Sequence, residues 1–334
     1  MKPCSPHLEE YKIKELLEPS FYARMAFRRT VIGSFPSRIS ELGLDRAIRW
    51  VIDIQLRYGI EIVTDGEQRG DLIKYFEQIP GLGRRSGRPA IVDRIKPPED
   101  LDDFYKLADC RKVFSYLREL GRTDVDVKIT ITGPVTLGFT YGMGGLGPYS
   151  SLLDKSLYLD LAYSLIPIIE KASRMGCYVQ VDEPGLTGRF LPPRIAGEIL
   201  EEFFREIHVG RELAIHVCGP LIDVPGLYDT LLRLDLDVLS LAFSSEKEER
   251  NLQIVSRKSL EDHGKKLGAG FISNVKAESA EEAFNRLKRI SERVGVENIS
   301  LVHPDCGFKR TPINVVEKIL EAMKKASDEF METL

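Results

Sequence analysis

Eight short runs of apolar residues recur along the chain, each with the length of a buried β-strand. The runs are rich in β-branched residues, and most end in glycine, proline or a polar residue, as strands do when they enter a turn. They occupy residues 29–36, 60–67, 126–134, 177–184, 213–220, 236–243, 266–273 and 299–307.

Amphipathic segments lie between these runs, with apolar residues three to four positions apart, which predicts helices. The clearest are residues 39–59, 156–176, 280–295 and 312–330, and the first two end at Gly59 and Gly176. Strands that alternate with helices predict a parallel sheet, and near-continuous apolar strands fit a sheet covered on both faces.

Eight consecutive strand–helix units close most simply into a (β/α)8 TIM barrel of the α/β class. A doubly wound open sheet is the alternative. No linker divides the chain, so we expect a single domain over residues 1–334. Residues 1–28 are expected to form an N-terminal extension, and residues 70–125 a largely helical insertion between the second and third strands.

The composition narrows the class of protein. The chain is 43% hydrophobic and 29% charged, with a net charge of -4 and no long block of one sign, so neither a nucleic-acid nor a membrane partner is expected. The N-terminus lacks the apolar core of a signal peptide, which favours a cytoplasmic protein. Five widely spread cysteines do not form the pattern of a disulfide framework.

The predicted strand ends carry the unusual residues. Six strands end in polar or turn-forming groups, which a barrel would gather at one rim. His216 and Cys218 lie two apart and share one face of their strand, and Cys306 ends another strand. Read alone, the pair is an ordinary core histidine beside a core cysteine, but the three together suit a zinc ion with an open position for a thiol.

Acidic and backbone groups surround this candidate site. Asp65 and Glu67 share one face at the end of a predicted strand, Asp182 lies at the end of another, and all three could pair with an ammonium group. Gly33 and Ser34 could offer backbone N–H groups to a carboxylate. An ammonium site, a carboxylate site and a thiolate site together indicate an amino acid with a side-chain thiol.

Seven stretches resemble, in order, the zinc-bearing C-terminal barrel of the cobalamin-independent methionine synthase family. They read VIGSFP, VTDGEQRGDLIKYF, TGPVTLG, VQVDEPGL, HVCG, DLDVLSLAF and HPDCGFKRTP. The chain looks like the short, single-barrel form known mainly from archaea and some bacteria. The resemblance implies methyl transfer to zinc-bound homocysteine, which forms methionine. It also implies zinc ligands at His216, Cys218 and Cys306, a homocysteine carboxylate site at Ile32, Gly33 and Ser34, and ammonium partners with a role in catalysis at Glu67 and Asp182.

The chain departs from the family pattern at three points. Ala242 stands where the family has a glutamate zinc ligand, which leaves Glu246 or the substrate thiol as the fourth ligand. No histidine occurs in residues 268–279, where the family has a catalytic one, and the TGPVT stretch lacks the expected tryptophan. The methyl donor therefore stays open among a folate, a pterin and a corrinoid protein. Another thiol such as coenzyme M, or a non-catalytic homologue, is the alternative.

One glycine motif is not taken as a nucleotide site. GMGGLG at residues 142–147 matches the dinucleotide-binding pattern, but it does not lie between a strand and a helix, because it follows LGFTY and leads into Pro148. We expect it to form a loop over the mouth of the barrel.

Overall fold

The structure is a computed structural model, and it describes residues 27–334. The predicted N-terminal extension lies outside the described residues except for its last two positions. Each of the eight predicted strands is present, most of them shorter than their apolar runs. They are β1 (Arg28–Arg29), β2 (Ile62–Val63), β5 (Asp126–Thr132), β6 (Tyr178–Asp182), β7 (Leu213–Val217), β8 (Val238–Ala242), β9 (Lys266–Ile272) and β10 (Ile299–Pro304).

The eight strands form one parallel sheet that closes on itself. Their order is β1-β10-β9-β8-β7-β6-β5-β2, and every pairing is parallel. The ring closes between β1 and β2, where Thr30 pairs with Ile62 and its hydroxyl donates to the Ile62 carbonyl at 2.8 Å. The predicted (β/α)8 barrel is therefore confirmed, and the open doubly wound sheet is excluded.

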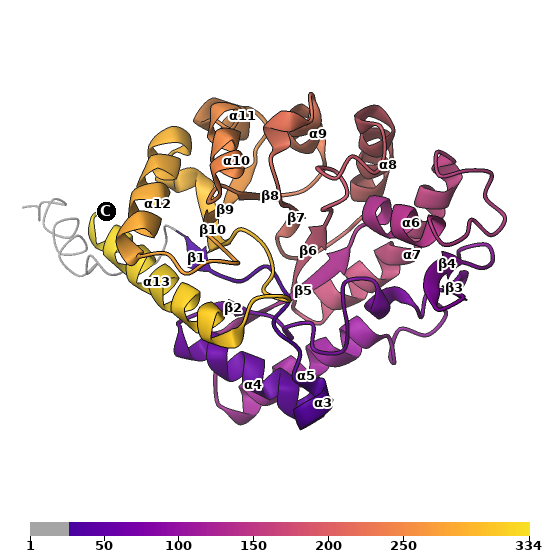
Figure 1. The fold of residues 1–334 in the computed structure, drawn as a ribbon, viewed down its shortest axis with the longest axis horizontal. Coiled ribbons are helices and arrows are strands. Elements are labelled where there is room, and N and C mark those ends of the chain that lie inside the picture. Colours follow the sequence, from indigo (N-terminus) through magenta and orange to yellow (C-terminus); the bar gives the residue numbers. More distant parts are fainter. Residues whose placement is uncertain (1–26) are drawn as a thin grey trace, which may run out of the picture.

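Helices surround the strands on all sides (Figure 1). The buried faces of these helices carry the apolar residues that the sequence spacing predicted. Several helices are followed by a glycine, because glycine adopts a positive φ at low cost, as Gly176 does at +94°. No helix in residues 27–334 is long and apolar enough to cross a membrane. The helices are α3 (Ile39–Leu42), α4 (Leu44–Arg57), α5 (Tyr105–Glu119), α6 (Pro134–Gly142), α7 (Lys155–Arg174), α8 (Pro193–Arg205), α9 (Leu227–Arg233), α10 (Glu246–Glu249), α11 (Arg257–Asp262), α12 (Ala280–Val294) and α13 (Ile313–Glu332).

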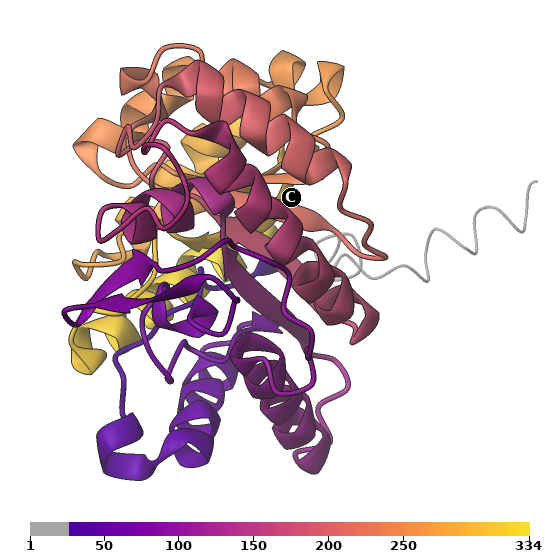
Figure 2. The same cartoon turned by 90° about the vertical axis from the view of Figure 1, so that its right-hand side faces the viewer.

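The connection between β2 and β5 differs from the predicted helical insertion. It contains one short 3-10 turn and an antiparallel hairpin, β3 (Leu82–Arg85) and β4 (Arg88–Ile91), before α5 begins. Ser86 and Gly87 both have positive φ, which suits the tight two-residue turn of a hairpin. Within residues 70–125, only α5 has the apolar spacing of a long helix, because prolines and glycines interrupt the residues before it. Figure 2 shows the hairpin on the left side of the molecule.

The glycine motif at residues 142–147 packs against this hairpin. The Ile91 N–H donates to the Gly145 carbonyl at 3.0 Å, and Ile91 also pairs with Leu146. A side chain on Gly144 would collide with the Pro89 carbonyl, 2.0 Å from the position of its Cβ. The motif follows helix α6 rather than a strand, so its glycines serve close packing.

The inside of the barrel is polar near the carboxyl ends of the strands, whereas Ile62, Ala214, Val238 and Leu301 form a small apolar cluster nearer their amino ends. The outer faces of the strands are apolar. On β5, Ile129 and Ile131 belong to the hydrophobic core. Lys128 and Thr130, which alternate with them, are also buried. Lys128 donates to Gln180 on β6, and the Thr130 hydroxyl donates to Glu67, which follows β2. This polar interior lies beneath the strand ends and supports the candidate site.

Candidate metal and substrate site

Three side chains from two strand ends meet at one rim of the barrel. His216 is on β7, Cys218 follows that strand, and Cys306 follows β10. One ligand atom of each lies within 4.8 Å of the others, and no other group of this kind occurs in residues 27–334. His216 is buried, whereas both cysteines are partly exposed. The arrangement can hold a metal ion and leave one side open.

The hydrogen bonds behind His216 fix which of its nitrogens carries the proton. Burial lowers the pKa of His303 to about 3, so this ring is neutral, and its Nδ1–H donates to the Pro304 carbonyl at 2.8 Å. Its Nε2 must then accept from the Ser240 hydroxyl at 2.8 Å. The Ser240 oxygen in turn accepts from His216 Nδ1 at 3.0 Å. In the neutral ring, His216 Nε2 then carries the lone pair, and it is buried without a partner among the described residues, as suits a metal ligand.

The two thiols of the group interact directly. A hydrogen bond between them lowers the pKa of Cys218 and raises that of Cys306 well above its usual range. Burial opposes the first shift and adds to the second. Cys218 is therefore the more readily deprotonated of the two thiols.

A cavity of about 70 Å3 opens beside these three residues. The structure brings five other residues that the sequence indicated to the same cavity. Its walls include Ile32, Gly33, Ser34, Glu67, Asp182, His216, Cys218 and Cys306, and Leu72, Pro184 and Gly307 complete them.

Glu67 presents one free carboxylate oxygen to the site. Its Oε1 accepts from Lys106 Nζ at 2.8 Å and from the Thr130 hydroxyl at 3.0 Å, and both partners are buried. Within the described part of the chain, no hydrogen bond reaches Oε2. The turn is unusual, because Glu67 has a φ of +50° and its N–H donates to Asp65 Oδ1 at 3.0 Å. The fixed turn holds the carboxylate at the cavity.

Asp182 has a similar arrangement. Its Oδ1 accepts from Gln180 Nε2 at 2.7 Å, and its other oxygen has no hydrogen bond from residues 27–334. Burial raises the pKa of Asp182 to about 6. An ammonium group in the cavity would stabilise the ionised form.

The backbone of residues 31–34 faces the site with its donors free. Each carbonyl in this segment accepts a hydrogen bond from a side chain or from the backbone. The Val31 carbonyl accepts from Lys128 at 2.6 Å, the Ile32 carbonyl from Gln180 at 3.1 Å, and the Gly33 carbonyl from the Thr64 hydroxyl at 2.9 Å. The Ser34 carbonyl accepts from the Phe308 N–H at 2.7 Å. The N–H groups of Gly33 and Ser34 have no partner among the described residues, so this segment can bind a carboxylate.

Glu246 does not join the metal-ligand group. It is exposed in the first turn of α10, where Ser245 caps the helix. Glu248, two residues further on, turns back and accepts from the Gly219 N–H at 3.1 Å, next to Cys218. Ala242 is fully buried at the end of β8 and offers only a methyl group.

Sequence reasoning missed the residues that support the site from inside the barrel. Lys128 and Gln180 interrupt apolar strands at the inward-facing positions, which is a signal that the strand pattern contains. Ser240 has the same signal on β8. Lys106 has none, because it lies on a helix and its partner Glu67 is 39 residues away.

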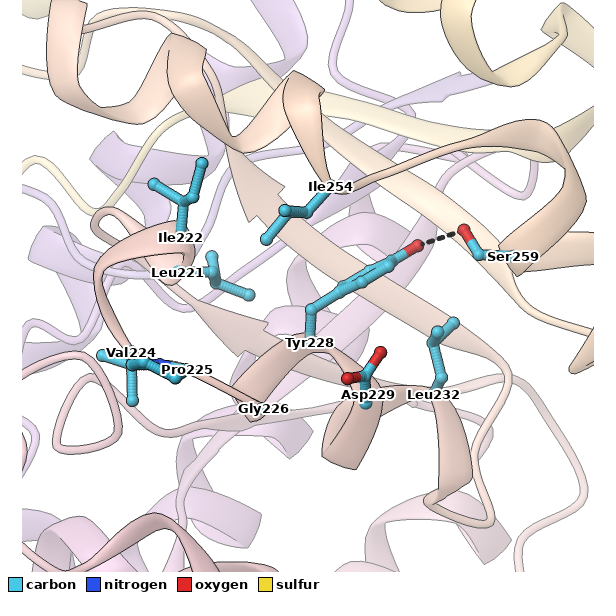
Figure 3. Close-up of a pocket in the computed structure, with 10 residues that line it drawn as sticks. All are labelled: Leu221, Ile222, Val224, Pro225, Gly226, Tyr228, Asp229, Leu232, Ile254 and Ser259. Atoms are coloured by element: carbon cyan, nitrogen blue, oxygen red, sulfur yellow. Dashed lines mark hydrogen bonds between the residues drawn. The ribbon is translucent and has the colours of Figure 1, made fainter.

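A second, larger cavity lies away from these residues and lacks their chemistry. It has a volume of about 300 Å3 and lies between α9 and the segments around residues 221–226 and 254–259 (Figure 3). Most of its lining residues are apolar, and the Tyr228 and Ser259 hydroxyls hydrogen-bond to each other at 2.8 Å. Asp229 is the one carboxylate among the lining residues, which include no cysteine or histidine. We therefore take the smaller cavity as the candidate site.

Comparison with known proteins gives consistent matches over most of the chain. A family model described as the catalytic domain of cobalamin-independent synthase matches residues 24–329. The methionine synthase of Methanothermobacter thermautotrophicus is 31% identical over 85% of this chain and 94% of its own length. The 5-methyltetrahydropteroyltriglutamate–homocysteine methyltransferase of Burkholderia thailandensis is 26% identical over 93% of this chain and 41% of its own length.

Solved structures share the fold. The B12-independent methionine synthase of a Shewanella species, in complex with selenomethionine, superimposes with a TM-score of 0.71 at 20% identity. The match covers 92% of this chain and 98% of the other.

Proposed function

The chain belongs to the cobalamin-independent methionine synthase family, and on this premise we propose that it transfers a methyl group to the thiol of homocysteine, forming methionine. One observation carries the proposal. A single cavity is lined both by a Cys/His group that can hold a metal and by groups that suit the two charged ends of an amino acid. A homocysteine molecule needs both.

Zinc is the metal that the donor set fits. Ligand atoms around a tetrahedral zinc with bonds of about 2.0–2.3 Å lie about 3.3–3.8 Å apart. The three donor atoms already lie within 4.8 Å of one another, and the buried Nε2 of His216 lacks any other partner in the described residues. When bound, zinc lowers the pKa of a coordinated thiol, so that the nucleophilic thiolate predominates at neutral pH.

The residues around the cavity bind and orient the amino acid. Gly33 and Ser34 donate their N–H groups to its carboxylate. Glu67 and Asp182 each offer one free oxygen to its ammonium group, and such charge-assisted bonds are short and directional. With both ends held, the thiol is aimed at the metal side of the cavity. Alignment of its sulfur at about 3–3.5 Å from the donor's methyl carbon then lowers the barrier to transfer.

Another thiol substrate is disfavoured by the two acidic groups. Coenzyme M has no ammonium group, so it would leave Glu67 and Asp182 without the cation for which their free oxygens are suited. A comparison of homocysteine with coenzyme M as methyl acceptor separates the two substrates. A non-catalytic homologue would turn over neither.

The proposal is tested by metal analysis and a donor screen on the full-length protein. The wild type should bind one zinc ion and form methionine with a methyl-folate, a methyl-pterin or a methylated corrinoid. The Cys218→Ala/Cys306→Ala variant should lose both properties. Cys177→Ala is the matched control, because this cysteine is buried away from the site. Full zinc occupancy in the double variant, or no methionine with any donor, would contradict the proposal.

A further inference from the structure

Two buried polar side chains inside the barrel connect the walls of the candidate substrate site. Lys128 is on β5 and Gln180 on β6, and their side chains are 3% and 1% exposed. The register pairs Thr130 with Gln180, so the inward-facing positions of the two strands lie side by side. A lysine and a glutamine buried here need partners, because an unsatisfied polar group in the interior is costly.

Their hydrogen bonds form one chain from the carboxylate wall to the ammonium wall. Lys128 Nζ donates to the Val31 carbonyl and to Gln180 Oε1, both at 2.6 Å. Gln180 Nε2 donates to the Ile32 carbonyl at 3.1 Å and to Asp182 Oδ1 at 2.7 Å. Gln180 therefore contacts both walls, and Lys128 fixes the orientation of its amide.

We propose that Lys128 and Gln180 are positioning residues that hold the carboxylate-binding segment and Asp182 at a fixed spacing, and so select α-amino acid thiols. The inference rests on the proposed function, because it assumes that an amino acid occupies the cavity. Neither residue is among those that line the cavity, so both act through the groups that they hold.

The spacing between the two walls matters because the ammonium and carboxylate groups of an α-amino acid are bonded to the same carbon atom. Both can be bound at once only if donors and acceptors are held at matching positions before the ligand arrives. Ordered supporting hydrogen bonds provide this preorganisation, and small shifts of such groups weaken binding strongly. A thiol that lacks the charged groups would not depend on the spacing.

The experiment compares the binding of three thiols to the zinc-loaded full chain by calorimetry. Homocysteine carries both charged groups, 4-mercaptobutanoate carries only the carboxylate, and 1-propanethiol carries neither. We expect the wild type to bind homocysteine at least about tenfold more tightly than propanethiol, because charge-assisted hydrogen bonds are the stronger ones. The measurement needs no methyl donor.

Two variants break the chain of hydrogen bonds at different links. Lys128→Met removes the ammonium group that orients Gln180. Gln180→Met keeps most of the volume of the side chain, but it can neither accept from Lys128 nor donate to Asp182 or to the Ile32 carbonyl. Both should weaken homocysteine binding about tenfold or more, leave propanethiol binding and zinc content unchanged, and affect mercaptobutanoate to an intermediate degree.

Ile129→Val is the matched control, because Ile129 is adjacent on β5 but faces the apolar core. It should leave the preference for homocysteine intact. The inference is overturned if both test variants bind homocysteine as the wild type does, or if they weaken all three thiols equally, since that would indicate a structural role only. If the wild type itself does not prefer homocysteine to propanethiol, the proposed function fails, and the inference fails with it.

Discussion

The ion pair between Lys106 and Glu67 gives the sharpest test of how the barrel interior is held together. The side chains are 1% and 9% exposed, so the pair is buried. Lys106 Nζ lies 2.8 Å from Glu67 Oε1, 2.9 Å from the Thr130 hydroxyl and 4.1 Å from the centre of the Tyr75 ring. Replacing Lys106 by methionine removes all three contacts while keeping most of the apolar volume.

The expected cost follows from the charge that remains. Removing one partner of a buried pair typically destabilises a protein by about 3–5 kcal/mol, because the other charge stays buried and uncompensated. Net stabilities are about 5–15 kcal/mol, so Lys106→Met should lose a large part of the total. The double variant Lys106→Met/Glu67→Gln removes both charges of the pair, and it should be more stable than Lys106→Met alone by about 1–3 kcal/mol.

Urea unfolding of the metal-free protein, followed by circular dichroism, measures these differences as shifts in midpoint. The control is Arg57→Met, which breaks an exposed pair with Glu317 whose N···O distance is 3.0 Å. Such pairs contribute about 0–1 kcal/mol. The reasoning is refuted if Lys106→Met costs no more than this control, or if the double variant is no more stable than the single one.

Three further variants test other parts of the structure. Ser240→Ala removes one of the two acceptors of His216 Nδ1 and leaves the Ser240 backbone carbonyl at 3.2 Å, so zinc affinity measured by competition with a chelator should fall about tenfold, and unchanged affinity would show that the hydroxyl is not needed. Burial lowers the pKa of Lys128 from 10.5 to about 7, so the unfolded chain binds more protons between these values. The free energy of unfolding of the wild type, relative to that of Lys128→Met, should therefore rise between pH 7 and pH 10.5, by up to about 1.4 kcal/mol per pH unit. If the difference between their urea midpoints does not change with pH, the pKa of Lys128 is not lowered. Gly144→Ala should destabilise the contact with Pro89 by about 1–3 kcal/mol and so make the hairpin more susceptible to limited proteolysis. An unchanged cleavage rate would contradict a role for this contact.

The barrel could be predicted from the sequence because its signals are local. Each strand is a short apolar run, and each clear helix shows the spacing of one apolar face. The hairpin at residues 82–91 could not be found in this way. Its strands have four residues each, and three of these eight residues are arginines, so no apolar alternation distinguishes it.

The candidate site was predictable to the extent that strand ends meet at one rim. This rule predicted that His216, Cys218 and Cys306 lie close together, although 88 residues separate the two cysteines in the sequence. It gave no guidance beyond the strand ends. Glu246 lies on a short helix whose direction depends on its capping by Ser245, and that direction leaves it exposed.

The alanine at the end of β8 changes the charge that the site offers to a substrate thiol. Ala242 is buried, and its carbonyl accepts from the Asn251 side chain at 3.0 Å, so the strand end is fixed with a methyl group in place of a carboxylate. With two thiolates and a neutral histidine, a site that binds zinc is neutral overall, whereas a carboxylate ligand would make it singly negative. A neutral site repels an incoming thiolate less than an anionic one does. The absence of the acidic ligand therefore favours the substrate thiol as the fourth ligand.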